Sequence, residues 1–200
     1  MNKNKFILRL AISIALVFTF SCSSGDDTGG GNSGGGGGTD TFKDIRDNRS
    51  YKFVKIGEQT WMAENLNYNA TGSKCGDEST RTLSDENTTT CDTYGRLYNF
   101  ATAKIACPAG WDLPTKADWE ILIITAGGEA TGGKYLRISG FKALAGGWGR
   151  PTGEFKNIGE AGFWRSTASG LILVIPNGGD KVAWNSDGDE YLHSVRCIKK

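Results

Sequence analysis

The sequence predicts an α+β domain, and two observations support this prediction. Apolar residues at helical spacing come first, in residues 97–106 and in the segment that follows Thr115. From Leu171 onward, short apolar runs alternate with turns rich in Gly, Asn and Asp, a pattern typical of strands. Two helices followed by a strand-rich half are the arrangement of an α+β fold.

The N-terminus has the pattern of an export signal. Residues 1–5 are short and basic, and residues 6–20 are apolar with Arg9 as their one charge. This run is short for a bilayer span, which needs about 20 apolar residues. We therefore expect residues 1–21 to be a signal peptide, with an uncleaved anchor helix as the alternative.

The residues around Cys22 indicate which kind of signal this is. Thr19, Phe20, Ser21 and Cys22 resemble a lipobox, although the usual Leu is missing three positions before the cysteine. In such a motif the cysteine thiol receives a diacylglycerol, and two or more acyl chains anchor a protein stably to a membrane. The resemblance implies an outer-membrane lipoprotein, and the acidic pair at 26–27 resembles the signal for display on the cell surface.

Residues 22–41 are expected to form a flexible tether. They contain almost only Gly, Ser, Asn, Thr and Asp, so they have too little apolar surface to form a packed structure. The first large apolar residues after them are Phe42 and Ile45. We therefore place one domain at residues 42–200.

Within the domain, residues 51–56 and 59–62 predict a hairpin around Gly57. Residues 97–106 predict a helix with Leu97, Ala101 and Ile105 on its apolar face. A second helix is expected to begin at Thr115, which forms a capping box with Asp118.

The C-terminal half predicts a meander of strands. Residues 171–175 are a continuous apolar run, residues 176–179 have turn chemistry, and residues 182–184 resume a strand. Asp187 and Gly188 are typical of a hairpin turn, after which residues 191–198 would complete the sheet.

Four cysteines remain when Cys22 is set aside. An even number in an exported chain indicates two disulfides, for which three pairings are possible. We favour Cys75–Cys91, which would close a polar loop, and Cys107–Cys197, which would join the start of the core to the last strand. Zinc is disfavoured because no C-x-x-C pair occurs and His193 is the only histidine.

The charge balance argues against a nucleic-acid partner. The chain has 23 Lys and Arg against 22 Asp and Glu, without a basic stripe. Catalytic signals are also weak, since His193 has no acidic residue at a useful spacing and is expected to be an ordinary polar strand residue.

With these elements placed, the chain resembles the Fibrobacter succinogenes major paralogous domain family of bacterial lipoprotein and secreted modules. The stretches that match are IGEQTWMAENL at 56–66, YGRLYN at 94–99, CPAGWDLPT at 107–115, GFW at 162–164 and SVRC at 194–197. They occur in the family's order and cover residues 51–199. The family has no established activity to carry over.

The segment LPT followed by Trp119 and Glu120, with the terminal VRC strand, also resembles C-type-lectin-like folds. This resemblance implies the same fold as the formylglycine-generating enzymes, but fold alone does not give function. Such an enzyme needs a reactive cysteine pair that binds copper, whereas Cys197 is better placed to pair with Cys107.

Among metals, calcium has the most specific sequence pattern in this chain. Trp184, Asn185 and Asp187 resemble the Trp-Asn-Asp motif of sugar-binding lectins, but Ser186 interrupts it and Ile175 stands where a carboxylate should be. The alternation of Asn185, Asp187 and Asp189 is EF-hand-like without the needed Gly. A turn is the preferred interpretation, and no cofactor is expected.

The tryptophans provide the remaining ligand-binding candidates. Those in the matching stretches or on the apolar face of the predicted helix are expected in the core: Trp61, Trp111, Trp119 and Trp164. Trp148 and Trp184 are expected nearer the surface, where an aromatic ring beside Asn and Asp suits stacking on a sugar.

We therefore expect a surface lipoprotein that presents a non-enzymatic binding module for glycans or envelope proteins, with Trp148, Trp184, Asn185 and Asp187 as candidate ligand contacts. A structural or adhesive surface protein without a discrete ligand site is the alternative, and an enzyme of the formylglycine-generating type is a further one.

Overall fold

The computed structural model describes residues 40–200. The expected signal peptide, Cys22 and most of the expected tether lie outside the described residues. Strand β1 (Asp40–Lys43) begins two residues before the predicted start of the domain. Between Asp40 and Lys200, no helix is both long enough and apolar enough to cross a membrane.

The described residues form an α+β structure, as predicted. The helices are α1 (Thr89–Tyr94), α2 (Phe100–Ala106), α3 (Lys116–Thr125) and α4 (Gly132–Ile138). The strands up to α3 are β1, β2 (Ser50–Ile56), β3 (Gln59–Met62), β4 (Cys75–Asp77), β5 (Thr82–Ser84), β6 (Leu97–Tyr98) and β7 (Trp111–Asp112). The later strands are β8 (Gly146–Gly149), β9 (Phe155–Ile158), β10 (Ala161–Arg165), β11 (Leu171–Pro176), β12 (Ala183–Ser186), β13 (His193–Ser194) and β14 (Ile198–Lys199).

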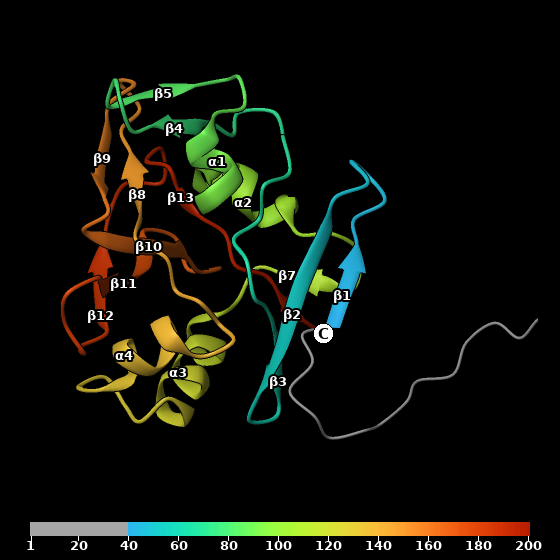
Figure 1. Ribbon diagram of the computed structural model, residues 1–200, viewed down its shortest axis with the longest axis vertical. Coiled ribbons are helices and arrows are strands. Elements are labelled where there is room, and N and C mark those ends of the chain that lie inside the picture. Colours follow the sequence, from blue (N-terminus) through green and yellow to red (C-terminus); the bar gives the residue numbers. More distant parts are fainter. Residues whose placement is uncertain (1–39) are drawn as a thin grey trace, which may run out of the picture. The chain divides into compact units, whose positions relative to one another are not determined.

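The first sheet has the strand order β1-β2-β3-β14-β7. The predicted hairpin is confirmed, because β2 and β3 pair antiparallel from Ile56 opposite Gln59 to Phe53 opposite Met62. The last strand, β14, lies between β3 and β7, so the C-terminus returns to the strands that begin the domain (Figure 1).

The second sheet has the order β12-β11-β10-β13-β6, and β8 joins it by pairing with β10 and β9. Strands β10, β11 and β12 run antiparallel in sequence, but β13 pairs parallel with β10 and not with β12. The predicted meander is therefore wrong after β12. The segment around Asp187 crosses to the far side of β10 instead of turning back along β12, and residues 191–198 supply strands to both sheets.

The helix expected at residues 97–106 begins only at Phe100, where the side chain of Asn99 caps the amide of Thr102. Its predicted apolar face is wrong, because Ile105 is 79% exposed and the buried residues are Thr102, Ala103 and Ala106. Leu97 is buried, but as part of β6.

Helix α3 follows the prediction closely. Thr115 and Asp118 form the capping box, and Trp119, Leu122 and Ile123 are buried on one face. Helices α1 and α4 were not predicted. Both are short, and α4 starts with Gly132 and Gly133, which have low helical propensity. Gly133 is needed because a Cβ there would lie 2.8 Å from the carbonyl oxygen of Asp180.

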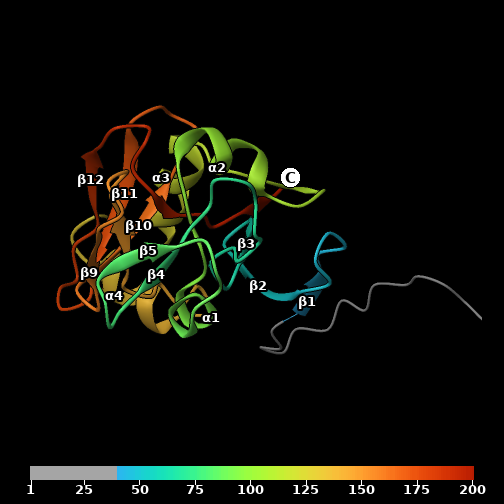
Figure 2. The ribbon, with the colours of Figure 1, turned by 90° about the horizontal axis from the view of Figure 1, so that it is seen from above.

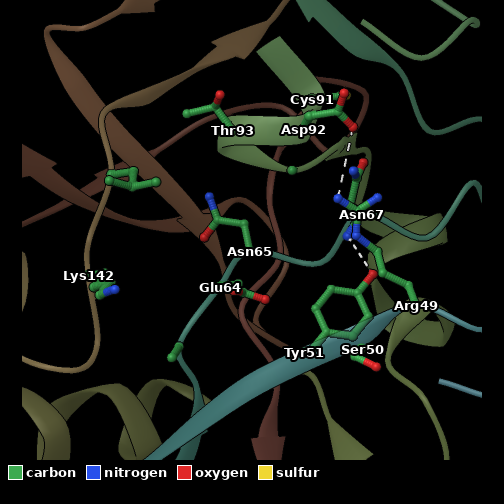
Figure 3. Close-up of a pocket in the computed structure, with 13 residues that line it drawn as sticks. Arg49, Ser50, Tyr51, Glu64, Asn65, Asn67, Cys91, Asp92, Thr93 and Lys142 are labelled. Carbon is green, nitrogen blue, oxygen red and sulfur yellow. Dashed lines mark hydrogen bonds and ion pairs between the residues drawn. The ribbon is translucent and has the colours of Figure 1, made fainter. Parts of the chain in front are cut away.

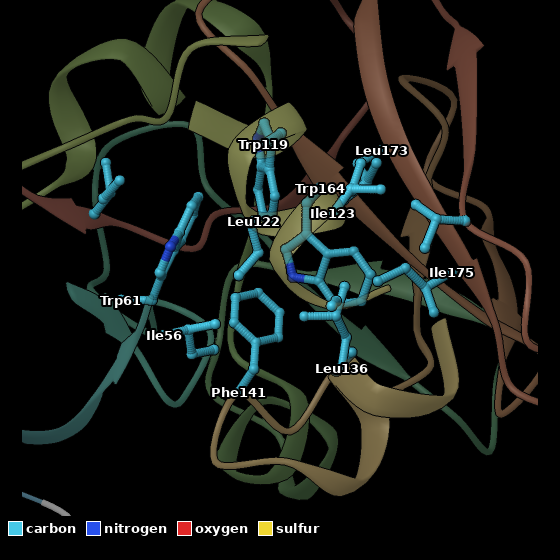
Figure 4. Packing of buried hydrophobic residues seen from close by; sticks show 14 residues of the cluster. Ile56, Trp61, Trp119, Leu122, Ile123, Leu136, Phe141, Trp164, Leu173 and Ile175 are labelled. Carbon is cyan, nitrogen blue, oxygen red and sulfur yellow. The ribbon is translucent and has the colours of Figure 1, made fainter. Parts of the chain in front are cut away.

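Strands β10, β11 and β12 lie on one side of the described structure, and β1 and β2 lie on the other (Figure 2). The main core combines residues of both sheets with residues of α3 and α4 (Figure 4). It contains Trp61, Trp119 and Trp164, each 0% exposed, around Phe141. Trp61 packs on Trp119 with ring centroids 4.7 Å apart. Trp111 lies in a second core and stacks on Phe42 at 4.5 Å. The four tryptophans predicted as core residues are therefore buried.

Both predicted disulfides are present. Cys75 pairs with Cys91 and closes the polar loop that contains β4 and β5, while Cys107 pairs with Cys197 across 90 residues. The second bond fixes the end of α2 to the segment that leads into β14.

Candidate functional site

The structure separates the two tryptophans that the sequence offered as ligand contacts. In the second sheet, Trp164, Leu173 and Trp184 lie in one row of paired residues. Trp164 and Leu173 are fully buried, and Trp184 packs against the same core. Because side chains alternate along a strand, Phe163 faces the opposite side of the sheet. Trp148 lies 6.3 Å from Phe163, so Trp148 and Trp184 are on opposite faces and do not form one site.

Trp148 is the centre of a half-buried aromatic surface, here called the Trp148 face and defined as Trp148, Phe163, Tyr191 and the adjoining His193. The Trp148 ring lies 5.6 Å from Tyr191 and 6.3 Å from His193, between centroids. Its Nε1 donates a hydrogen bond of 2.8 Å to Oδ1 of Asn157. The indole is therefore held in place on a sheet, with partly exposed aromatic area and polar groups at its edge.

The close approach of β8 to β10 depends on two glycines. Gly147 and Gly162 are paired in register, and Gly147 has φ 68°, a conformation that suits glycine. A Cβ on Gly162 would lie 2.2 Å from the ring of Trp164. These glycines bring Trp148 beside Phe163.

His193 is not the ordinary polar strand residue that the sequence indicated. Its side chain is 0% exposed, and its Nε2 lies 3.4 Å from Oδ2 of Asp187. The prediction failed because the acidic partner is six residues away in a segment that crosses between strands. Burial lowers the pKa of His193 to about 4, and Arg165 contributes in the same direction while Asp187 opposes it. His193 is therefore neutral at pH 7, and its contact lowers the pKa of Asp187.

Arg165 fixes the segment that carries Tyr191. Its guanidinium is fully buried, and Nη2 donates to the backbone carbonyls of Gly188, Asp189 and Tyr191. Burial lowers the pKa of Arg165 to about 10, so it remains charged at neutral pH. Nε and Nη1 of Arg165 and both ring nitrogens of His193 are buried without a hydrogen-bond partner among residues 40–200. Such a concentration of buried polar atoms without a hydrogen-bond partner is uncommon in a folded protein.

Asn185, Asp187 and Asp189, which suggested a calcium site, each contact a different group of the protein. The carboxylate of Asp189 accepts hydrogen bonds from Ser169 Oγ and the amide of Gly170, while Asp187 contacts His193. Asn185 is exposed, and its Oδ1 accepts from the amide of Ser186. Within the part of the chain that the structure describes, no three His, Cys, Asp or Glu side chains are grouped so that they could hold a metal ion.

Four of the stretches that resemble the family meet at Asn65, which itself lies in the stretch at 56–66. Its Oδ1 accepts from Trp164 Nε1 at 2.8 Å and from Nε and Nη2 of Arg196 at 3.0 and 2.7 Å. Its Nδ2 donates to the carbonyl of Tyr94 at 2.7 Å. These hydrogen bonds hold the two main sheets together from inside the core, which is a structural role.

The fold and the Trp148 face define an α+β domain with two disulfides and an aromatic surface on one sheet. The model of the Fibrobacter succinogenes major domain family matches residues 54–199. The chain belongs to this family. The comparison with curated proteins gives no match, and the comparison with solved structures gives none either.

Sequence reasoning named Trp148 and Asp187 as candidates, did not name Phe163, Tyr191 or Arg165, and interpreted His193 as an ordinary strand residue. Phe163 and Arg165 stand on either side of Trp164, so alternation along that strand would have placed both on the face opposite the core. No local signal predicts that β13 pairs with β10 or that Leu192 forms a β-bridge with Gly149, and these two contacts bring Tyr191 and His193 to Trp148.

Proposed function

We propose that this protein is an outer-membrane lipoprotein displayed on the cell surface, and that its domain is a non-enzymatic, C-type-lectin-like module that binds glycans through the Trp148 face. The lipobox-like Cys22 supports the anchor. The mixed two-sheet architecture with a returning C-terminal strand supports the lectin-like assignment. The observation that carries the binding role is the half-exposed indole of Trp148, fixed by Asn157 and flanked by Phe163 and Tyr191.

This arrangement suits a sugar ring. An aromatic face stacks on the apolar side of a pyranose, while polar groups at its edge bond to hydroxyls. Arg150 lies 5.8 Å from the Trp148 ring and pairs with Glu154 at 3.0 Å, which places both charge signs beside the indole.

A non-enzymatic role is supported by the state of the reactive groups. His193 is 0% exposed and has no access to a substrate. The four cysteines of the described residues are joined in two disulfides, which differs from the reactive pair that a formylglycine-generating enzyme requires.

The test is binding of the full chain, purified in detergent, to a broad glycan panel with calcium and with chelator. We expect calcium-independent binding that Trp148→Ala abolishes. Trp184→Ala is the matched control, because it removes the same ring from the opposite face and is expected to leave binding intact in molecules that remain folded. A failure to bind any glycan, or equal loss in both variants, would contradict the proposal. Loss with chelator would instead favour a metal site near Asn185 and Asp187.

Anchoring has its own test. Mass spectrometry of the mature protein should find Cys22 as the first residue and carrying lipid, and protease added to intact cells should remove the domain. An unmodified Cys22, or complete protection in cells with intact outer membranes, would contradict that part of the proposal.

A second candidate function, binding to envelope proteins, is favoured by the exposed apolar residues of α3 and α4. Ile124 and Ile138 are 73% and 76% exposed. If they bind a partner, Ile124→Ser with Ile138→Ser should reduce cross-linking to envelope proteins. Ile105→Ser, which removes a similarly exposed residue from α2, should leave cross-linking unchanged.

A further inference from the structure

A polar pocket lies away from the Trp148 face, between the start of β2, the segment after β3, α1 and the segment after α4. It has a volume of about 310 Å³, within the range of small-ligand sites. Its lining includes Arg49, Tyr51, Glu64, Asn67, Asp92 and Lys142. We call it the Asn67 pocket.

The lining carries two charges of each sign. Arg49 and Lys142 are cationic, and Glu64 and Asp92 are anionic. Figure 3 shows Arg49 and Asp92 together at one end with Asn67, and Lys142 at the opposite end. The Arg49 and Asp92 side chains are 39% and 58% exposed, and their closest N–O distance is 3.9 Å. Such a loose, exposed pair contributes little stability, so both groups are available to a ligand.

Asn67 is the distinctive residue of this pocket. It is 7% exposed, and neither Nδ2 nor Oδ1 has a hydrogen-bond partner among the described residues. Its backbone amide donates to the hydroxyl of Tyr51 at 3.0 Å, so the residue is held in position. An amide buried without a partner costs about 1–3 kcal/mol per group.

Asn65 shows what a structural asparagine looks like in the same segment. It is also 7% exposed, yet its Oδ1 and Nδ2 both have partners in the core. The side-chain amide of Asn67 therefore has a free acceptor, Oδ1, and a free donor, Nδ2, whereas the amide of Asn65, two residues earlier, uses both. This donor and acceptor pair complements a peptide group, which offers one N–H and one C=O.

We propose that the Asn67 pocket binds a short zwitterionic peptide of two or three residues. Asn67 pairs with its peptide group, Arg49 binds its carboxylate, and Glu64 binds its ammonium group. Guanidinium binds carboxylates in a bidentate manner, which suits Arg49 to this role. A neutral sugar would leave all four charged side chains without partners, and a ligand of one charge sign would match only half of them. This inference is independent of the glycan proposal, because it uses different residues on different elements.

The first experiment is calorimetric titration of the full chain in detergent with alanyl-alanine. We expect saturable binding that weakens at least tenfold when the N-terminus is acetylated or the C-terminus is amidated. Free alanine, which lacks the peptide group, should bind at least tenfold more weakly than the dipeptide. Absence of saturable dipeptide binding, or tighter binding of N-acetylglucosamine than of the dipeptide, would overturn the proposal.

The second experiment separates a binding role for Asn67 from a structural one. Asn67→Leu replaces an unpaired amide with an apolar group of similar size, so we expect dipeptide binding to fall at least tenfold while the melting temperature stays the same or rises. Asn69→Leu, at an exposed position two residues later, is the control and should change neither quantity. A lower melting temperature for Asn67→Leu, or unchanged binding, would overturn the assignment.

Glu64→Gln provides a variant at a half-exposed position where misfolding is not a concern. It should weaken binding of alanyl-alanine several-fold but leave unchanged the weaker binding of the N-acetylated dipeptide, which has no ammonium group. An equal effect on both ligands would show that Glu64 does not contact the ammonium group and would overturn its assignment.

Discussion

Arg196 and Arg165 are both fully buried, but their guanidinium groups differ in how many of their nitrogens form hydrogen bonds. Every guanidinium nitrogen of Arg196 has a partner, since Nε and Nη2 donate to Asn65 and Nη1 donates to the carbonyls of Met62 and Phe141. In Arg165 only Nη2 is bonded, and Nε and Nη1 have no partner within residues 40–200. Arg196 is enclosed by the core, whereas Arg165 lies beside His193 behind the Trp148 face.

This difference separates a structural region from a candidate binding region. Neither arginine forms an ion pair with a carboxylate within 4.0 Å in the described residues, so hydrogen bonds to oxygens must offset the loss of hydration. Burial lowers the pKa of Arg196 to about 9, which leaves it charged at neutral pH. The Arg196 region, which is Arg196 with Asn65 and Trp164, is fully bonded and holds the sheets together. The Arg165 region, which is Arg165 with His193 and Asp187, retains unpaired polar atoms next to partly exposed aromatic rings.

The largest effect is expected from the disulfide that borders the Arg196 region. Replacing Cys107 and Cys197 with Ala opens a link across 90 residues and should cost about 4–5 kcal/mol by the loop-entropy model. Replacing Cys75 and Cys91, which are 16 residues apart, should cost about 3 kcal/mol. Urea unfolding of both double variants checks the order, and a larger loss for the shorter link would contradict it.

The second-largest loss of unfolding free energy is expected when the buried arginines are replaced, and the two replacements can be compared directly. Arg196→Met removes the donor from the carbonyls of Met62 and Phe141 and two of the three donors from Asn65, so it should cost about 3–4 kcal/mol. Arg165→Met removes the bonds of a single nitrogen and also removes unpaired donors, so it should cost about 1–2 kcal/mol. Equal losses of unfolding free energy would remove the distinction between the two regions.

The pH dependence of stability tests the Arg165 region alone. The pKa of His193 falls from 6.5 in the unfolded chain to about 4 in the fold, so the unfolded state binds the proton first. Stability should therefore be complete above pH 6.5 and decline as the pH falls toward 4, by up to about 3 kcal/mol. His193→Phe should flatten this part of the curve, because His193 is the only histidine. A curve of the same slope in the variant would show that other groups are responsible.

The smallest effect on stability is expected at Trp148. Trp148→Phe loses the 2.8 Å hydrogen bond to Asn157 but keeps an aromatic ring, so the loss of unfolding free energy should be about 1 kcal/mol or less. Trp164→Phe is the matched change in the Arg196 region, where it removes the 2.8 Å hydrogen bond to Asn65 inside the fully buried core and should cost more. Thermal unfolding of both variants measures the difference, and the reverse order would contradict the division into regions.

Much of the fold was predictable because it depends on local chemistry. The α3 capping box, the β2–β3 hairpin and the buried tryptophans follow from the spacing of Thr115, Asp118, Gly57 and the apolar residues. The disulfide pairs were also anticipated, from the positions of the cysteines relative to a polar loop and the last strand. In these cases residues close in sequence, or covalent chemistry, determine the outcome.

The candidate sites depended on long-range contacts. The sequence by itself determined an α+β domain, its cysteine pairs, most of its core and the prominence of Trp148. Only the tertiary structure decided that Trp184 faces the core, that His193 meets Asp187 under the Trp148 face, and that Asn67 remains unpaired while Asn65 does not. The physical reason is that strand pairing fixes which face each side chain occupies, and β13 pairs with β10 through contacts between segments about 30 residues apart, a partner choice that no local pattern specifies.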